Sequence, residues 1–170
     1  MSQKEKVLEL LKKVSPLPKQ GRNNITADKK GENKGVVLGK VRDFLGHGKG
    51  NKAGDIVTAR LTNTPKYNPL FEEASKLMKQ HNPGFKFTSI QINENQKTSK
   101  HKDGYNVGKS YIIGLGDYTG GEVRVYTKDG KSYKDINIKN RWATFNGSEL
   151  EHETLPFKGT RFTLVFYNVN

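Results

Sequence analysis

The sequence predicts a mainly β protein of the α+β class, in which an antiparallel sandwich or jelly roll follows N-terminal supporting helices. After residue 84, apolar residues recur at every second position in short runs separated by glycine, asparagine or aspartate turns. Before that point, two segments show the one-sided apolar spacing of amphipathic helices. Because 170 residues is the size of one domain, we expect 1–84 to be the helical and loop part, and 85–170 the core, of a single domain 1–170.

The first helix is expected at residues 3–13, where leucine and valine alternate with lysine and glutamate until Pro16 stops the pattern. The second is expected within "YNPLFEEASKLMKQHNPG", where Pro69 fits the first turn and Pro83 ends the helix. Between them we expect a polar loop, a strand at "GVVLGKVRDF" and a mobile basic loop at "GHGKGNKAG".

Six strands are expected after the second helix. They are "FKFTSIQIN", "SYIIGLG", "EVRVYT", "SYKDINI", "RWATFN" and "TRFTLVFYNV". No helical pattern separates them, and strands that follow one another in this way pair antiparallel.

Composition limits the chemistry. Apolar residues make up 32% of the chain, and no run approaches the length of a membrane span. We therefore expect a soluble intracellular protein, cytoplasmic, nuclear or viral. We also expect a monomer. Without cysteine there is neither a disulfide nor a thiolate metal site, so a metal must rest on histidine and carboxylate. "GHGKG" lacks the serine or threonine of a phosphate-binding loop, which argues against ATP binding.

The formal net charge of +13 favours a polyanionic partner, above all nucleic acid. A basic surface that serves only solubility is the alternative.

The motif "KHKDGYN" places His101 and Asp103 two positions apart, which on an extended chain directs both side chains to one side. His152, just before the last strand, offers a third ligand from another part of the fold. Two histidines and one carboxylate form the facial triad of non-haem Fe(II) oxygenases. The alternative is an ordinary His-x-Asp surface loop.

Nine residues after His152, Arg161 opens the final strand and offers a guanidinium that matches a carboxylate in bidentate fashion. With this arginine, residues 85–169 resemble the 2-oxoglutarate/Fe(II)-dependent dioxygenases, whose fold is the double-stranded β-helix, a jelly roll of the cupin-like type. The resemblance implies Fe(II), 2-oxoglutarate and O₂ as cofactor and co-substrates. It also implies Arg161 as the ligand of 2-oxoglutarate, with Thr163, Tyr111 and Asn93 as further candidates that are otherwise core polar groups.

"HKDGYN" further resembles the His-Lys-Asp-x-x-Asn signature of the TET/JBP group, which oxidises the methyl group of 5-methylpyrimidines. That likeness implies that Asn106 and Tyr105 face a substrate base, although Asn106 also suits a plain turn. "GLGDYTGGEVRVY" is similar to a Gly-Gly-containing strand pair in related dioxygenases. Basic residues suited to phosphate contacts are Lys49, Lys52, Lys40, Arg42, Lys100 and Lys102.

Three functions remain open at this point. The first is hydroxylation of a nucleic-acid base, with DNA favoured over RNA, and the second is hydroxylation of prolyl or lysyl side chains in a protein substrate. The third is a non-enzymatic, cupin-like module that binds nucleic acid. An intact triad with Arg161 argues against the third.

Overall fold

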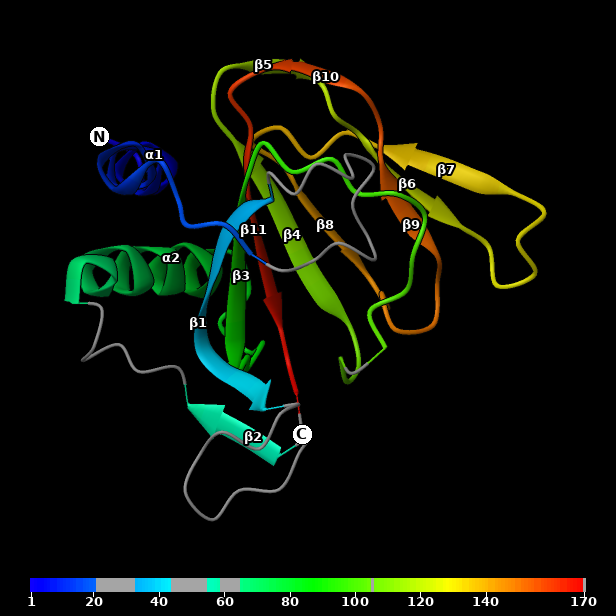
Figure 1. The fold of residues 1–170 in the computed structure, drawn as a ribbon, viewed down its shortest axis with the longest axis horizontal. Helices are drawn as coiled ribbons and strands as arrows, with labels where there is room; N and C mark the ends of the chain where they lie inside the picture. Colours follow the sequence, from blue (N-terminus) through cyan, green and yellow to red (C-terminus); the bar gives the residue numbers. More distant parts are fainter. Residues whose placement is uncertain (21–32, 44–54, 59–64, 105, 170) are drawn as a thin grey trace.

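The computed structural model describes residues 1–20, 33–43, 55–58, 65–104 and 106–169, with no side chains described for 41–43 and 55–58. Figure 1 shows two helices on one side of a large sheet and smaller β-structures on the other side. Neither α-helix in these ranges is long and apolar enough to cross a membrane. The loop expected at "GHGKGNKAG" lies outside the described residues.

The large sheet has six antiparallel strands in the order β2-β1-β3-β11-β4-β8. Its strands are β1 (Lys34–Asp43), β2 (Asp55–Thr58), β3 (Ser89–Glu94), β4 (Ser110–Leu115), β8 (Trp142–Phe145) and β11 (Phe162–Tyr167). The central strand β3 is buried along its whole length. Its Ile90 and Ile92 join the main core, whereas Gln91 and Asn93 line a cavity on the opposite side. The period-two pattern therefore separates a packing face from a polar face.

The second layer contains two smaller sheets, also antiparallel. One has the order β7-β6-β9, from β6 (Val123–Tyr126), β7 (Tyr133–Ile136) and β9 (His152–Thr154). The other pairs β5 (Tyr118–Gly120) with β10 (Phe157–Gly159). A small core of Val123, Val125, Ile138 and Ala143 packs under this layer. This arrangement confirms the jelly roll that the sequence predicts.

The helices cover the outer face of the large sheet (Figure 1). They are α1 (Gln3–Val14), and α2 (Asn68–His81) preceded by a 3₁₀ turn η2 (Pro65–Tyr67). In α2, Leu70, Ala74 and Leu77 follow helical spacing and belong to the same buried core as Ile90 and Ile92. The helices thus stabilise the large sheet and leave its other face to the cavity.

Candidate metal centre

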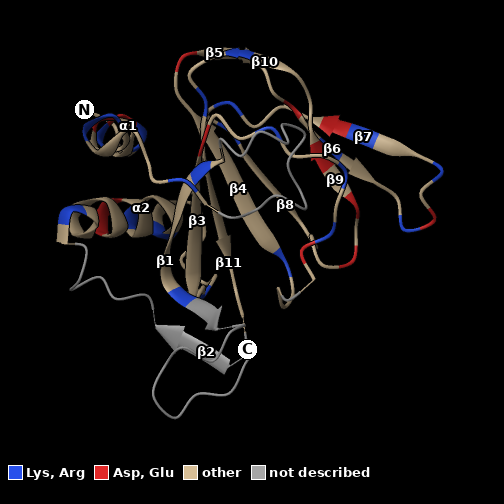
Figure 2. Cartoon of the chain, viewed as in Figure 1, with Lys and Arg blue, Asp and Glu red and all other residues tan. Residues whose placement is uncertain are grey.

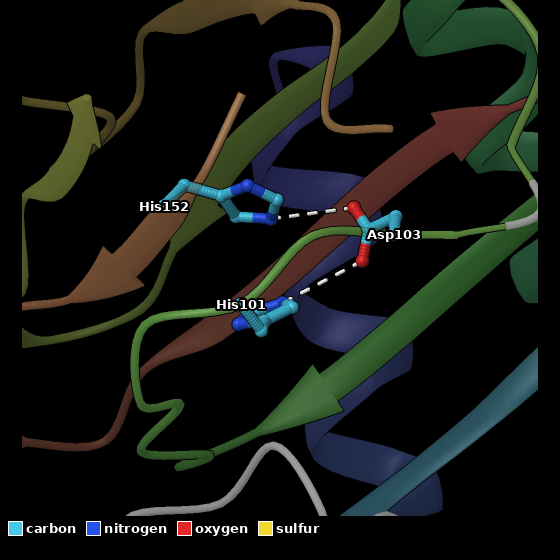
Figure 3. A group of neighbouring side chains, drawn as sticks. All are labelled: His101, Asp103 and His152. Carbon is cyan, nitrogen blue, oxygen red and sulfur yellow. Dashed lines mark ion pairs between the residues drawn. The ribbon is translucent and has the colours of Figure 1, made fainter. Parts of the chain in front are cut away.

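Two of the predicted ligands lie on the extended segment between β3 and β4. Along it, Lys100 and Lys102 are exposed, whereas His101 and Asp103 are half-buried. The third, His152, is the first residue of β9 and is buried. Figure 3 shows the three side chains converging on one point.

A backbone bridge brings the two histidines together. The N–H of His101 donates to the carbonyl of His152 at 3.0 Å, and the N–H of His152 donates back at 2.9 Å. Residues that exchange both bonds across an antiparallel pair lie directly opposite each other with side chains on one side. The imidazole centroids are accordingly 4.4 Å apart. His152 is therefore brought beside His101 although the two lie on separate segments of the chain.

The ring orientations suit metal binding. Nδ1 of His101 lies 2.6 Å from the carbonyl oxygen of Ser99, and Nδ1 of His152 lies 2.9 Å from that of Leu150. A carbonyl oxygen only accepts, so each Nδ1 carries a proton, and Nε2 is the ring nitrogen left to face the carboxylate or a metal. Both Nε2 atoms face the Asp103 carboxylate, at 3.5 Å from His101 to Oδ1 and 3.3 Å from His152 to Oδ2.

The carboxylate is held in its charged form. Burial alone would raise the pKa of Asp103, but hydrogen bonds from His101 and His152 outweigh it and hold the pKa well below its usual range. One ligand atom from each of the three residues lies within 4.8 Å of the others. Two imidazoles and one carboxylate on one side of a centre fit Fe(II) with positions left open, so the residues present match the predicted metal.

The triad opens into a cavity of about 170 Å³ between the two layers. Its polar lining beyond the triad includes Gln91, Asn93, Gln96, Asn106, Ser110, Arg161 and Thr163. Its apolar lining includes Ile112, Val123, Phe145 and Val165. The cavity therefore joins the predicted metal ligands to the predicted arginine.

Arg161 is 3% exposed. Its Nη2 donates to the carbonyl of Gly121 at 2.9 Å, but its buried Nε has no hydrogen-bond partner among the described residues. No carboxylate of the described chain forms an ion pair with it. Burial lowers the pKa of Arg161, yet a guanidinium starts so high that it stays charged. Tyr118 and the charge of Glu122 offset the effect of burial only in part. A buried cation with an unused donor and no ion-pair partner among the described residues fits an anionic ligand.

Residues from the second layer shape the space around this guanidinium. The Tyr118 and Phe157 ring centroids lie 5.7 Å and 5.4 Å from the Arg161 guanidinium carbon. A Cβ at Gly121, whose φ is +71°, would lie 2.7 Å from Arg161 Nε. Only glycine is tolerated there, because a side chain would meet both the strained φ and the guanidinium. In the sequence, the Gly-Gly pair pointed to Gly121, but no motif indicated that Tyr118 lies beside the arginine.

Three further predicted residues line the cavity. Asn93 and Thr163 are opposite each other on β3 and β11, and Asn93 Nδ2 donates to Thr163 Oγ1 at 2.9 Å. Asn106 follows the metal motif in a turn, where its N–H donates to the carbonyl of Asp103 at 3.3 Å. Asn106 does not adopt the left-handed backbone that a plain asparagine turn would favour.

Tyr111 is a correction, because it is not at the cavity. Its hydroxyl accepts from Asn82 Nδ2 at 3.0 Å, and its ring packs on Phe85 at 4.5 Å on the outer face of the large sheet. Alternation along β4 instead turns Ser110 and Ile112 inward. Sequence reasoning selected the correct strand but the wrong face, and missed Ser110.

The remaining candidates cannot be placed at the centre. Tyr105, Lys49 and Lys52 lie outside the described residues, as does the side chain of Arg42. Lys40, like Lys100 and Lys102, is exposed.

The sequence matches no protein-family model, and a comparison with curated proteins finds no match either. Solved structures do resemble the chain. NgTET1 in complex with 5mC DNA superposes with a TM-score of 0.55 at 16% identity, covering 98% of this chain and 68% of that one. An oxidoreductase of the 2OG-Fe(II) oxygenase family from Burkholderia pseudomallei superposes with a TM-score of 0.55 at 18% identity, covering 94% of this chain and 77% of that one.

A third similar structure is a prolyl hydroxylase in complex with a hypoxia inducible factor oxygen degradation domain peptide fragment, from Trichoplax adhaerens. It gives a TM-score of 0.52 at 13% identity, covering 98% of this chain and 78% of that one. At such identities the likeness concerns the fold. The chain thus has the jelly-roll architecture found in structures of 2-oxoglutarate-Fe(II) oxygenases.

Proposed function

We propose that this protein is an Fe(II)- and 2-oxoglutarate-dependent dioxygenase that hydroxylates a C–H bond of its substrate. The observation that carries the proposal is a single cavity lined by both the His101, Asp103 and His152 cluster and the buried Arg161, whose Nε has no hydrogen-bond partner among the described residues. A fold shared with 2OG-Fe(II) oxygenase structures supports it. A structural metal site would have no need of a buried guanidinium beside it.

In this proposal each residue has a defined task. His101, Asp103 and His152 hold Fe(II) on one face, and Arg161 binds the far carboxylate of 2-oxoglutarate, with Thr163 beside it. The bound iron, with 2-oxoglutarate and O₂, supplies oxidative decarboxylation coupled to C–H hydroxylation. Apolar residues of the cavity wall restrict water around the centre.

The first test measures succinate formed from 2-oxoglutarate in the presence of Fe(II) and O₂, by mass spectrometry. Replacing both His101 and Asp103 by alanine should abolish succinate, because one remaining ligand cannot hold the metal. Glu72→Ala, an exposed change on α2, serves as the control and should leave turnover unchanged. Succinate produced at the wild-type rate by the double variant would contradict the metal assignment.

As substrate we propose a nucleic-acid base of the 5-methylpyrimidine type, in DNA more than RNA. The similar structure of NgTET1 holds 5mC DNA, and the segment 97–109 around the metal motif carries four lysines with Asp103 as its only acidic residue. Asn106 lines the cavity beside the triad, where its amide could read the polar edge of a base. Phosphate contacts would supply affinity for any nucleic acid, and the cavity would select the base that is oxidised.

The second candidate is a protein hydroxylase. The similar prolyl hydroxylase holds a peptide fragment, and the spacing from His152 to Arg161 resembles that branch. Incubation with oligonucleotide and peptide pools, read for the mass of one added oxygen atom, separates the two. A non-enzymatic module would produce neither product nor succinate.

A further inference from the structure

The connection between β8 and β9 contacts two of the three ligands, although none of its residues belongs to the triad. The carbonyl of Gly147 accepts the backbone N–H of Asp103 at 2.8 Å. The carbonyl of Leu150 accepts the Nδ1 proton of His152 at 2.9 Å. Just before the connection, the Phe145 ring packs on the His152 imidazole, with centroids 5.0 Å apart.

Gly147 makes the closest approach. A Cβ built on it would lie 2.6 Å from Asp103 Oδ2 and 3.2 Å from Cε1 of His152. The first separation is shorter than real Cβ contacts, so an added methyl group would have to displace something. The backbone of Gly147 is not left-handed, so alanine fits its conformation and the conflict is with the ligands alone.

The connection itself is braced, so it resists movement. The carbonyl of Asn146 accepts the N–H groups of Leu150 at 2.9 Å and Glu149 at 3.2 Å. Its side-chain oxygen accepts the Ser148 hydroxyl at 2.7 Å. Asp103, by contrast, lies on an extended segment ending in a turn. An added methyl group should therefore shift the carboxylate rather than the connection.

We propose that residues 146–150 are the positioning element of the metal centre, and that Gly147 is a positioning residue that sets the carboxylate of Asp103. This inference rests on the metal site of the proposed function. In it, the missing side chain at position 147 lets one carboxylate oxygen face each histidine. Residues that orient metal ligands typically contribute about 10- to 100-fold in metal affinity.

The test compares Gly147→Ala with Gly104→Ala. Gly104 follows Asp103 directly, has no atom within 4 Å of its built Cβ and has no left-handed backbone, so it controls for the general effect of glycine removal. Binding of Co²⁺ alone is followed by calorimetry and by the visible spectrum of the bound ion. We expect Gly147→Ala to weaken binding about 10- to 100-fold and alter the spectrum, and Gly104→Ala to change neither.

Thermal unfolding of the metal-free proteins separates positioning from folding. Gly147→Ala should unfold close to the wild-type temperature while losing affinity. If it does not fold, Asn146→Ala, which loosens the brace without adding atoms, should weaken Co²⁺ binding instead. Wild-type affinity and spectrum in a folded Gly147→Ala, or in Asn146→Ala when the former does not fold, would overturn the inference. Absence of Co²⁺ binding in the wild-type protein would instead refute the metal site itself.

Discussion

At the scale of single residues, Arg161 gives the clearest indication of a ligand, because its buried guanidinium has no ion-pair partner among the described residues. Taking a cation out of water costs free energy that a carbonyl, two aromatic rings and the charge of Glu122 offset only in part. A dicarboxylate in the cavity would supply the missing charge and use the free Nε donor. Ser110 is a second buried polar group on the cavity wall. Its hydroxyl has no hydrogen-bond partner among the described residues, so a polar ligand in the cavity would satisfy it as well.

Arg161→Lys keeps the charge but loses the planar fork that matches a carboxylate. A hydrogen bond to a charged group contributes about 1.5–3 kcal/mol, so the KM for 2-oxoglutarate should rise roughly 10- to 100-fold. The measurement is succinate formation over a range of 2-oxoglutarate concentrations. Tyr111→Phe is the control: it removes the hydroxyl bonded to Asn82, costs about 1 kcal/mol of stability and should leave that KM unchanged. A KM unaltered in the lysine variant would exclude Arg161 from co-substrate binding.

Residue types and short spacings made much of the centre predictable. His101, Asp103 and Arg161 could be named because the two ligands stand two positions apart in one motif and the arginine stands at the start of the final expected strand. Gly147 could not be named, because its meaning lies in closeness to Asp103, 44 residues away in sequence. Tyr111 was predicted on the wrong face of its strand. Alternation in the sequence separates the two faces, but it does not tell which face the helices cover and which lines the cavity.

At the scale of elements, length decided what could be predicted. The six expected strands each contain enough residues to show alternation, and each corresponds to an observed strand. β5, β9 and β10 have three residues each, too few to show a period of two in the sequence. β9 is nevertheless the strand that places His152 beside His101 and Asp103.

Glu94, at the end of β3, connects the N-terminal part to the jelly roll. Its buried carboxylate accepts the Ser15 hydroxyl at 3.0 Å and the N–H of Leu17 at 3.1 Å. Glu94→Ala should lower the free energy of unfolding by roughly 2–3 kcal/mol, because it leaves a buried N–H without an acceptor. Glu94→Gln retains one acceptor and should lose less. Urea denaturation measures both, and equal stability of Glu94→Ala and wild type would show that this connection does not stabilise the fold.

At the scale of the whole molecule, the helices and the metal centre lie on opposite faces of the large sheet (Figure 1). Basic residues occur on both sides, with acidic ones among them on β7 and β9 (Figure 2). The net charge of +13 alone therefore does not locate a binding surface. The surface proposed for nucleic acid is the segment that carries His101 and Asp103, where Lys100 and Lys102 are exposed beside the predicted metal ligands.

Replacing Lys100 and Lys102 together by alanine tests this location. If both contact phosphates, the slope of log affinity for an oligonucleotide against log salt should become shallower by roughly two units, because each contact releases about one counterion. Replacing Lys12 and Lys13 on α1 removes the same charge from the opposite face and should leave the slope nearly unchanged. Fluorescence anisotropy at several salt concentrations measures it. Equal slopes for the two double variants would place nucleic acid elsewhere on the surface, and no binding at low salt would favour the peptide substrate.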